Sequence, residues 1–253
     1  GIPLIIDNTA SPVICKPLAH GAAIVKHSLT KYIGGHGTSI GGIVVDGGNF
    51  DWIKDRKRQP LLNEPDQSYG GAIWSDVVPQ LTGANIPFVI RLRVVLLRDL
   101  GAPLSPFNAF QIIQGLETVG LRMKQHCSNA EKVVSFLETQ KKVTNVIYPT
   151  NHQGEIKERA KKYMQGGYGS LVGKDVGTKE NGAKFIDNLK MLYHVANIGD
   201  ARSLAIHPAT TTHSQLNDKE LLAAGVTPGY VRLSIGIEHP DDIIADIKQA
   251  LAA

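Results

Sequence analysis

The sequence predicts an α/β protein, in which the first part contributes strands to a mostly parallel sheet and the last part forms a smaller α+β unit. Two apolar runs near the N-terminus, Leu4–Asp7 and Ala22–His27, are each typical of a buried strand that ends at polar residues. At Ser105 a hydroxyl followed by proline indicates a helix start, and apolar residues keep helical spacing to about Gln140. Strand and helix patterns then alternate to the C-terminus.

The long helix divides the chain into two expected domains, because a helix of that length typically bridges two cores. We assign residues 1–115 to the first domain and residues 116–253 to the second. Within the first, Gly42–Asp46 is predicted as a third strand. The polar stretch of about 47–98, rich in Gly and Pro with interspersed aromatic residues, indicates a long ordered excursion from that domain.

The second domain is expected to hold short strands and helices in alternation. The strands are predicted at Val143–Tyr148, Gly166–Val172, Val195–Ile198 and Tyr230–Glu238, and the helices at Gln153–Gln165, Asn181–Tyr193 and Ile243–Leu251, the last opened by Pro240 and two acids. Strict alternation in Tyr230–Glu238 puts Val231 and Leu233 on one side of that strand and Arg232 on the other.

Composition and charge exclude several classes of function. The formal net charge is only +4, with cations scattered among acids, so no nucleic-acid footprint is present. Cys15 and Cys127 lie far apart without metal-ligand spacing, which argues against a zinc site or a disulfide framework and fits a reducing cytoplasm. No apolar run approaches the length that spans a bilayer. We therefore expect a cytoplasmic protein that binds neither nucleic acid nor membrane.

The ends of the first two predicted strands carry the residues that point to chemistry. Asp7 ends the first strand, and Ser28, Thr30 and Lys31 follow the second. In open α/β sheets ligands bind at the carboxyl ends of strands, so these side chains are expected to converge. A carboxylate for a pyridine nitrogen, an amine for a Schiff base and hydroxyls for a phosphate are what pyridoxal 5'-phosphate requires. Lys31 is therefore the predicted Schiff-base lysine.

Two other features of the second domain bear on binding. His207 and His213 are separated by six positions without a nearby carboxylate pair, which makes a metal site improbable, so we predict none. Arg232 projects from a half-buried strand, and its planar fork suits a substrate carboxylate held by two hydrogen bonds. An ordinary surface charge is the alternative interpretation of this arginine.

Four stretches, in this order along the chain, carry a resemblance to a known family. The sequence resembles the Cys/Met-metabolism family of pyridoxal-phosphate enzymes, and within it the O-acetylhomoserine sulfhydrylase subgroup, in Ile6-Asp7-Asn8-Thr9, in His27-Ser28-Leu29-Thr30-Lys31-Tyr32-Ile33-Gly34-Gly35-His36, in His207-Pro208-Ala209-Thr210-Thr211-Thr212-His213 and in Val231-Arg232-Leu233-Ser234-Ile235-Gly236-Ile237-Glu238. The segment Ala196–Leu204 is also similar to that subgroup, with Asn197 where several relatives carry Ser. The resemblance covers essentially the whole chain.

The resemblance implies a fold and a role for each candidate residue. It implies the aspartate aminotransferase-like fold of type I, with residues 1–115 as the C-terminal part of the large cofactor-binding domain. It implies that Lys31 forms the Schiff base and that Asp7 pairs with the pyridinium nitrogen. It also implies that Ser28 and Thr30 hold the phosphate of the cofactor. Asn197 and Arg232 are implied to hold the α-carboxylate of the substrate.

The resemblance also implies a reaction and an assembly. The expected reaction is a γ-replacement that converts O-acetylhomoserine and sulfide, or a thiol, to homocysteine or methionine and acetate. Cystathionine γ-synthase and methionine γ-lyase activities are the alternatives within the family, and a non-catalytic scaffold subunit is the alternative from another class. The chain opens on a buried-strand pattern without Met, so we expect an N-terminal segment of the same enzyme outside it, and a homotetramer built from dimers.

Overall fold

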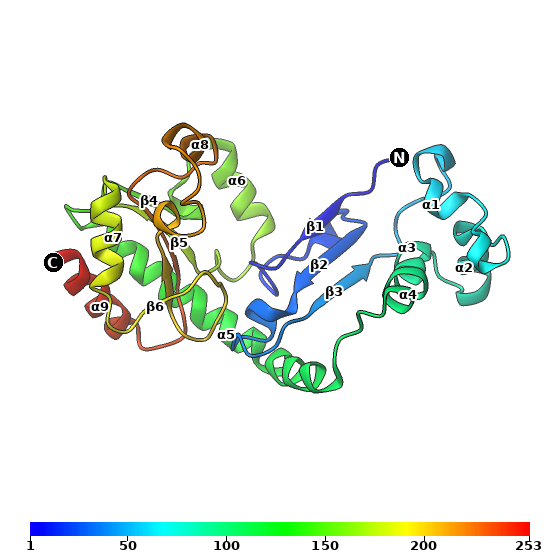
Figure 1. Ribbon diagram of the computed structural model, residues 1–253, viewed down its shortest axis with the longest axis horizontal. Helices are drawn as coiled ribbons and strands as arrows, with labels where there is room; N and C mark the ends of the chain where they lie inside the picture. The colour runs from blue at the N-terminus through cyan, green and yellow to red at the C-terminus, as the bar shows by residue number, and fades with distance from the viewer.

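The computed structural model describes residues 1–253 and shows an elongated molecule made of three packed regions. A three-stranded sheet lies in the centre, a group of short helices lies at one end, and a five-stranded sheet with its helices lies at the other (Figure 1). One long helix runs from beside the central sheet into the five-stranded region. The candidate site lies where the central sheet meets that region.

The central sheet has the strand order β1-β2-β3 and contains the three strands predicted from the first part of the sequence. Strand β1 (Ile5–Asp7) is parallel to β2 (Ile24–Ser28), with Asp7 opposite Lys26. Strand β3 (Gly42–Asp46) is antiparallel to β2 and places Gly42 opposite Ser28. The sheet thus brings the end of β1 beside the end of β2, where the candidate residues follow.

The predicted ordered excursion forms a helical cluster whose core is shared with the central sheet. Its helices are α1 (Pro60–Asn63), α2 (Trp74–Thr82), α3 (Pro87–Arg91) and α4 (Arg98–Leu100), with a π-helical segment at Leu92–Leu97. Buried Trp52, Trp74 and Val78 pack here with Ala23 and Ile24 of the central region. Taken one at a time, none of the helices is both long and apolar enough to cross a membrane, although α2 and Pro87–Leu100, bent by 101°, pass such a test as a pair.

Helix α5 (Pro106–Glu138) confirms the predicted long helix at both ends. It contains 33 residues, and the Ser105 hydroxyl accepts a hydrogen bond from the Asn108 backbone N–H at 3.1 Å. The first half of α5 packs on the segment after β2 through buried Ile112 and Val119, and the second half packs in the five-stranded region. The predicted domain division near residue 115 stays a prediction, because one continuous helix passes through it.

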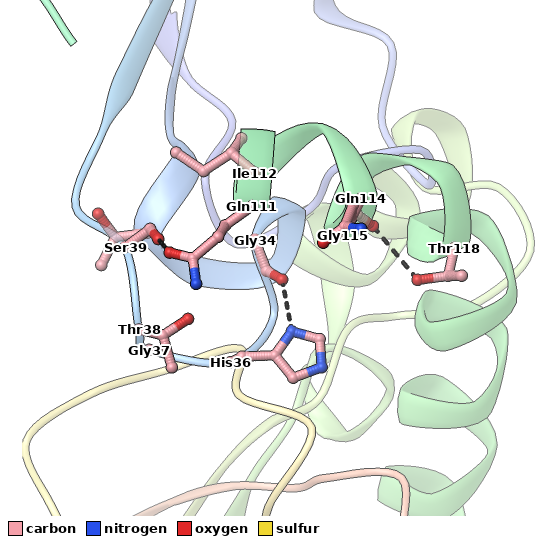
Figure 2. A pocket seen from close by; sticks show the side chains of 11 residues that line it. Gly34, His36, Gly37, Thr38, Ser39, Gln111, Ile112, Gln114, Gly115 and Thr118 are labelled. Atoms are coloured by element: carbon pink, nitrogen blue, oxygen red, sulfur yellow. Dashed lines mark hydrogen bonds between the residues drawn. The ribbon is translucent and has the colours of Figure 1, made fainter. Parts of the chain in front are cut away.

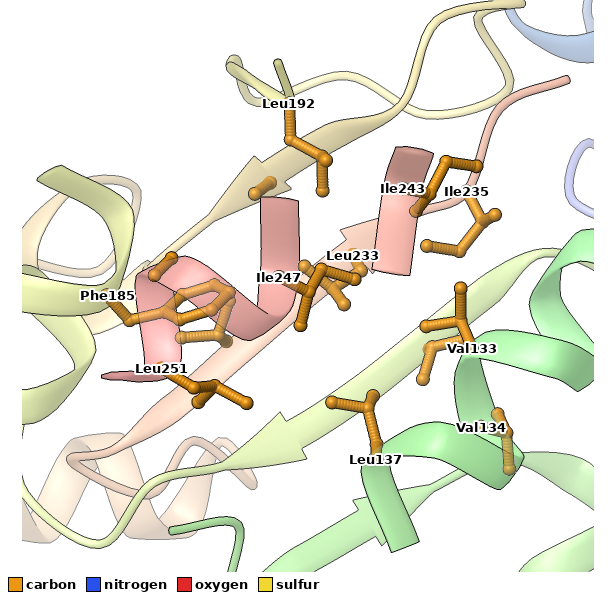
Figure 3. Close-up of a cluster of buried hydrophobic side chains, with 14 of the residues drawn as sticks. Val133, Val134, Leu137, Phe185, Leu192, Leu233, Ile235, Ile243, Ile247 and Leu251 are labelled. Atoms are coloured by element: carbon orange, nitrogen blue, oxygen red, sulfur yellow. The ribbon is translucent and has the colours of Figure 1, made fainter. Parts of the chain in front are cut away.

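The second sheet has the order β4-β5-β8-β7-β6, and its helices cover a large apolar core. Its strands are β4 (Asn145–Ile147), β5 (Leu171–Asp175), β6 (Tyr193–His194), β7 (Leu204–Ile206) and β8 (Tyr230–Ser234), and the helices of this region are α6 (Gly154–Tyr163), α7 (Lys179–Asp187), α8 (Asp218–Ala223) and α9 (Pro240–Ala252). Only the β6–β7 pair is parallel. Figure 3 shows the core where α5, α7 and α9 meet the sheet.

The strands predicted for this region differ from the structure at several places. The strand expected at Tyr230–Glu238 ends at Ser234. The strand expected at Gly166–Val172 begins only at Leu171, because the glycines before it, Gly166, Gly167 and Gly169, have positive φ angles of 81°, 141° and 84°. The strand expected at Val195–Ile198 is wrong, since this stretch is a loop between β6 and β7. The sequence interpretation also missed β7 itself.

The helix predicted at Asn181–Tyr193 ends at Asp187, and the cause is a buried carboxylate on α9. Asp246 accepts hydrogen bonds from the backbone N–H groups of Lys190, Met191 and Leu192 at 2.8 to 3.0 Å. Burial disfavours the charged carboxylate, but these bonds outweigh it and lower the pKa of Asp246. The three amides therefore turn to α9 rather than continue the helix.

Candidate active site

The predicted Schiff-base lysine lies on a tight turn directly after β2. Leu29–Ile33 forms a π-helical turn, and within it Lys31 has non-helical angles of φ −89° and ψ −129°. The turn closes through hydrogen bonds from Gly34 N–H to the Leu29 carbonyl at 2.8 Å and from Gly35 N–H to the Lys31 carbonyl at 2.7 Å. Irregular backbone inside a π-helical turn is common at functional sites.

The half-buried amine of Lys31 points to a loop from the second sheet. Its Nζ donates a hydrogen bond to the Asn197 side-chain oxygen. Burial lowers the pKa of the Lys31 amine, and the positive charge of Arg232 lowers it further. A lysine in this setting loses its proton more readily than an exposed one, as a nucleophilic amine requires.

Arg232 and Asn197 lie together because the loop that carries Asn197 is held against β8. Arg232 donates from Nη2 to the Asn197 backbone carbonyl at 3.3 Å. Two residues along β8, the hydroxyl of buried Ser234 accepts a hydrogen bond from the Gly199 N–H at 3.0 Å. The structure therefore brings Lys31, Asn197 and Arg232, which are distant in sequence, into one cluster.

Asp7 belongs to a second group at the end of β1. Its Oδ1 accepts hydrogen bonds from the Thr9 hydroxyl at 2.6 Å and the Thr9 N–H at 3.1 Å, and its Oδ2 lies 3.1 Å from Lys26 Nζ. The Thr9 hydroxyl lowers the pKa of Asp7 most, and Lys26 acts in the same direction. The same hydroxyl accepts the Ser28 N–H at 2.8 Å, so Thr9 joins Asp7 to Ser28.

Thr30 contacts the glycine-rich return toward β3 rather than either group. Its hydroxyl accepts a hydrogen bond from Gly41 N–H at 3.1 Å and lies 3.4 Å from the Gly41 carbonyl oxygen. The Leu29 N–H also donates to the Gly41 carbonyl, at 2.9 Å. These hydrogen bonds hold Leu29 and Thr30, at the start of the lysine turn, against Gly41. Ser28 is the residue directly before this turn.

A polar cavity of about 480 Å³ adjoins this turn on the side of α5. Figure 2 shows its wall, in which Ser39 hydrogen-bonds to Gln111 of α5 and His36 hydrogen-bonds to the Gly34 carbonyl. Of the six predicted site residues only Thr30 lines the cavity. The amine of Lys31 therefore faces the Asn197 loop and not this space.

The two histidines considered as metal ligands have other contacts. His207 is fully buried, and its ring nitrogens contact the Thr210 hydroxyl at 2.9 Å and the Pro228 carbonyl at 2.8 Å. His213 Nδ1 contacts the Thr212 hydroxyl at 2.9 Å. Both His207 nitrogens thus serve the packing of the five-stranded region.

Sequence reasoning assigned no role to Thr9 or Arg122, and both contact the site. Thr9 follows Asp7 by two positions, a spacing at which a side chain commonly bonds the local backbone. Arg122 lies on α5 and donates two hydrogen bonds to carbonyls of the lysine turn. The sequence pattern that could have revealed Arg122 is its helical spacing. It lies four residues before His126 and three after Val119, on the buried side of the helix.

Comparisons with known proteins find one family, and the match extends over nearly the whole chain. The sequence model for "Cys/Met metabolism PLP-dependent enzyme" matches residues 1–252. The chain is similar to the O-acetyl-L-homoserine sulfhydrylase of Leptospira meyeri, with 51% identity over 99% of this chain and 58% of that protein. It is 44% identical to the homocysteine synthase of Schizosaccharomyces pombe, covering 99% of this chain and 58% of that one.

A solved structure extends the similarity to three dimensions. It is the crystal structure of a Campylobacter jejuni protein described as an O-acetylhomoserine (thiol)-lyase and contains N'-pyridoxyl-lysine-5'-monophosphate. Its TM-score is 0.89 at 40% identity, over 100% of this chain and 59% of that one. This chain therefore spans somewhat more than half the length of the relatives that it matches. From the match over residues 1–252 and these identities, the chain belongs to the Cys/Met-metabolism family of pyridoxal-phosphate-dependent enzymes.

Proposed function

We propose that the full-length protein catalyses a γ-replacement in which O-acetylhomoserine and sulfide, or a small thiol, give homocysteine or methionine and acetate. The single observation that carries the proposal is the cluster of Lys31, Asn197 and Arg232. It joins an amine of lowered pKa to an amide and a guanidinium, which suit an α-carboxylate. Relatives named for this chemistry support the choice of substrate.

The residues present fit pyridoxal phosphate by the chemistry of their side chains. Lys31 is a primary amine whose hydrogen-bond partner is a neutral amide, so no carboxylate neutralises it. Asp7 stays ionised because its pKa is lowered, as a partner for a protonated pyridine nitrogen must. Ser28 and Thr30 would hold the phosphate. When bound, the cofactor supplies an electron sink for the carbanion that forms at the substrate Cα.

The chain's own residues would divide the remaining work. Arg232 and Asn197 hold the substrate carboxylate and orient the Cα–H bond toward Lys31. The amine of Lys31 removes the proton from Cα and then moves a proton at Cβ, and its lowered pKa favours the unprotonated form that the first step needs. Acetate leaves from Cγ, and the sulfur nucleophile takes its place. Lys31 then returns the protons.

Replacing Lys31 tests the proposal directly. In the full-length protein loaded with pyridoxal phosphate, Lys31→Ala should abolish the borohydride-trapped adduct and reduce turnover by at least about 1,000-fold, because the base and the covalent anchor are lost together. Lys132→Ala, which removes an exposed lysine of α5, is the matched control and should behave as wild type. An adduct that persists in Lys31→Ala would exclude the assignment.

A substrate comparison separates the related activities. O-acetylhomoserine with sulfide should turn over faster than O-acetylhomoserine with cysteine, and methionine alone should not react. Faster turnover with cysteine would instead identify a cystathionine γ-synthase, and consumption of methionine alone a methionine γ-lyase. Absence of pyridoxal phosphate from the full-length protein would favour the non-catalytic scaffold. We also propose that the protein acts in the cytoplasm together with the N-terminal segment that its relatives contain.

A further inference from the structure

Arg122 is a buried cation whose hydrogen-bond partners are all neutral oxygens. Its side chain is 6% exposed, and its guanidinium donates to the carbonyls of Tyr32 at 2.6 Å, Ile33 at 2.9 Å and Gly115 at 2.7 Å. Its Nε donates to the Thr118 hydroxyl at 3.2 Å. Burying a charge is costly unless hydrogen bonds compensate it, and here four do. Burial lowers the pKa of Arg122, and no acid is paired with it.

Two of those partners are the carbonyls that directly follow Lys31 along the chain. They lie at the carboxyl end of the π-helical turn, where carbonyl groups lack partners within the turn. The guanidinium binds the two carbonyls through separate nitrogens of a planar fork, whereas an ammonium would have to reach both from a single nitrogen atom. Arg122 therefore ties the backbone on the C-terminal side of Lys31 to helix α5.

The space around the guanidinium is shaped to admit it. Gly35 has φ of 78°, and a Cβ at that position would clash with the guanidinium. At Gly115 a Cβ would clash with the carbonyls of Ile33 and Gly34, so the turn lies directly on the helix. Two glycines, one on the turn and one on α5, thus allow the close approach that the four hydrogen bonds require.

The opposite side of the turn is fixed by the domain that supplies Asn197. The buried Tyr32 ring leaves no room for a Cβ at Gly199, and its hydroxyl hydrogen-bonds to Ser170 at 2.8 Å. The Ala201 N–H donates to the Gly35 carbonyl at 2.8 Å. Lys31 therefore lies between a face set by the Asn197 loop and a face set by Arg122.

We propose that Arg122 is a positioning residue for Lys31, in which the guanidinium fork holds the lysine turn so that its amine meets Asn197 and Arg232. This inference rests on the proposed role of Lys31. The fork acts on Lys31 through the backbone and contacts neither substrate nor cofactor. Losing it would let the turn move off α5 and carry the amine away from the half-buried cluster.

The test compares Arg122→Lys, which keeps a charge but loses the fork, with Arg122→Met, which loses both. In the cofactor-free full-length protein, the pKa of the Lys31 amine is measured by competitive acetylation across pH, with mass spectrometry of the labelled peptide. Both variants should raise this pKa toward that of an exposed lysine. In the loaded enzyme both should lower kcat by about 10- to 100-fold with a smaller change in KM, because the reacting amine is misplaced.

Leu137→Ala is the control for lost stability, since Leu137 is fully buried on the same helix but in the core of the five-stranded region. It should lower the unfolding temperature and leave the Lys31 pKa unchanged. Thr118→Val removes the Nε partner together with the 3.3 Å hydrogen bond that this hydroxyl donates to the Gly115 carbonyl. It should shift the pKa of Lys31 in the same direction by less, which keeps the test open if the Arg122 variants fail to fold.

Two results would overturn the proposal. Arg122 variants that unfold earlier but keep the wild-type Lys31 pKa and kcat would make the arginine purely structural. A shift in Arg122→Met but none in Arg122→Lys would assign the effect to charge rather than to position. Borohydride trapping of the wild-type enzyme tests the proposed function independently of the role of Arg122. A wild-type enzyme without an adduct at Lys31 contradicts the proposed function, whereas the titration of the cofactor-free protein still measures how Arg122 positions Lys31.

Discussion

Two lysines of this chain have amines whose pKa is lowered by burial, and they differ in what surrounds them. Lys31 is half-buried and faces Asn197. Lys174, on β5, is fully buried, and its Nζ lies 3.2 Å from the centre of the Phe185 ring without a hydrogen-bond partner in the protein. Burial lowers the pKa of this amine, and the neighbouring Asp175 charge offsets only part of that effect. The first arrangement suits chemistry, and the second should cost stability.

Lys174→Met is expected to stabilise the fold in a pH-dependent way. Burial lowers the pKa of Lys174 from 10.5 to about 7, so between these pH values the unfolded chain binds a proton that the folded protein does not. The wild type should therefore gain stability as pH rises from about 7 to 10.5, and its deficit should be complete below pH 7. At pH 7 the variant should be more stable by on the order of 1–3 kcal/mol.

Urea denaturation at several pH values between 6 and 10 checks this expectation. The difference in the free energy of unfolding between Lys174→Met and the wild type should become smaller as pH rises. Lys132→Met, at an exposed position of α5, should show no such gap and controls for the loss of one charge. A gap of constant size would mean that packing and not proton binding sets the stability of this core position.

At the scale of single residues, the sequence could place a carboxylate and an amine but not their surroundings. Asp7 ends β1 and Lys31 comes shortly after β2, and both strands were recognisable as apolar runs. Asn197 came only from the resemblance, because a loop has no periodicity that predicts its neighbours. Arg122 was hidden by its own charge, since an arginine within a helix usually faces solvent and here hydrogen bonds to carbonyls from a distant segment compensate its burial.

Among the elements, helix α5 connects the central sheet to the five-stranded region. Two glycines in its N-terminal half differ in the space around them. A Cβ at Gly115 would clash with the lysine turn, whereas nothing lies within 4 Å of one at Gly120. Alanine favours the helical state by about 1 kcal/mol over glycine. The substitution stabilises the helix only where the added Cβ meets no other atoms. The same substitution on the same helix should therefore have effects of opposite sign.

Gly120→Ala should stabilise the protein by about 0.5–1 kcal/mol, and Gly115→Ala should destabilise it by about 1–3 kcal/mol because it overpacks the contact with the turn. Calorimetric melting of both variants measures the signs. Gly115→Ala should also reduce turnover, since it pushes the turn from α5, while Gly120→Ala keeps wild-type turnover. Equal effects of the two substitutions would show that the turn does not rest on the helix.

Which elements could be predicted depended on whether local pattern or distant partners decided them. Helix α5 has a capping serine, a proline in its first turn and a sustained apolar period, and it was predicted to within about two residues. Helix α7 was predicted too long, because Asp246 on another helix takes the amides that would have continued it. Strand β7 pairs between β6 and β8, and its three residues are too few for a periodic signal.

For the molecule as a whole, one surface lacks the polar covering that a monomer should have. Phe107, Phe110, Ile113 and Leu116 recur every third residue on the first half of α5, and their exposed fractions lie between 51% and 66%. Side chains three residues apart form a row inclined to the helix axis, so these four make an oblique apolar stripe that winds partway around α5. Exposed stripes of this kind usually mark an interface with another chain.

We predict that a second copy covers this stripe, in line with the expected homotetramer. Closed homo-oligomers bury the same patch of each subunit, and a helix face can meet its own copy across a two-fold axis. Phe110→Glu should place a charge in that contact and shift the full-length protein to a smaller species in sedimentation velocity. Leu222→Glu, at an exposed leucine of α8, is the matched control and should leave the mass unchanged. If Phe110→Glu keeps the wild-type mass, the stripe contacts something other than a second subunit. If both variants dissociate, added negative charge alone explains the change, so only the difference between the two substitutions assigns the interface to α5.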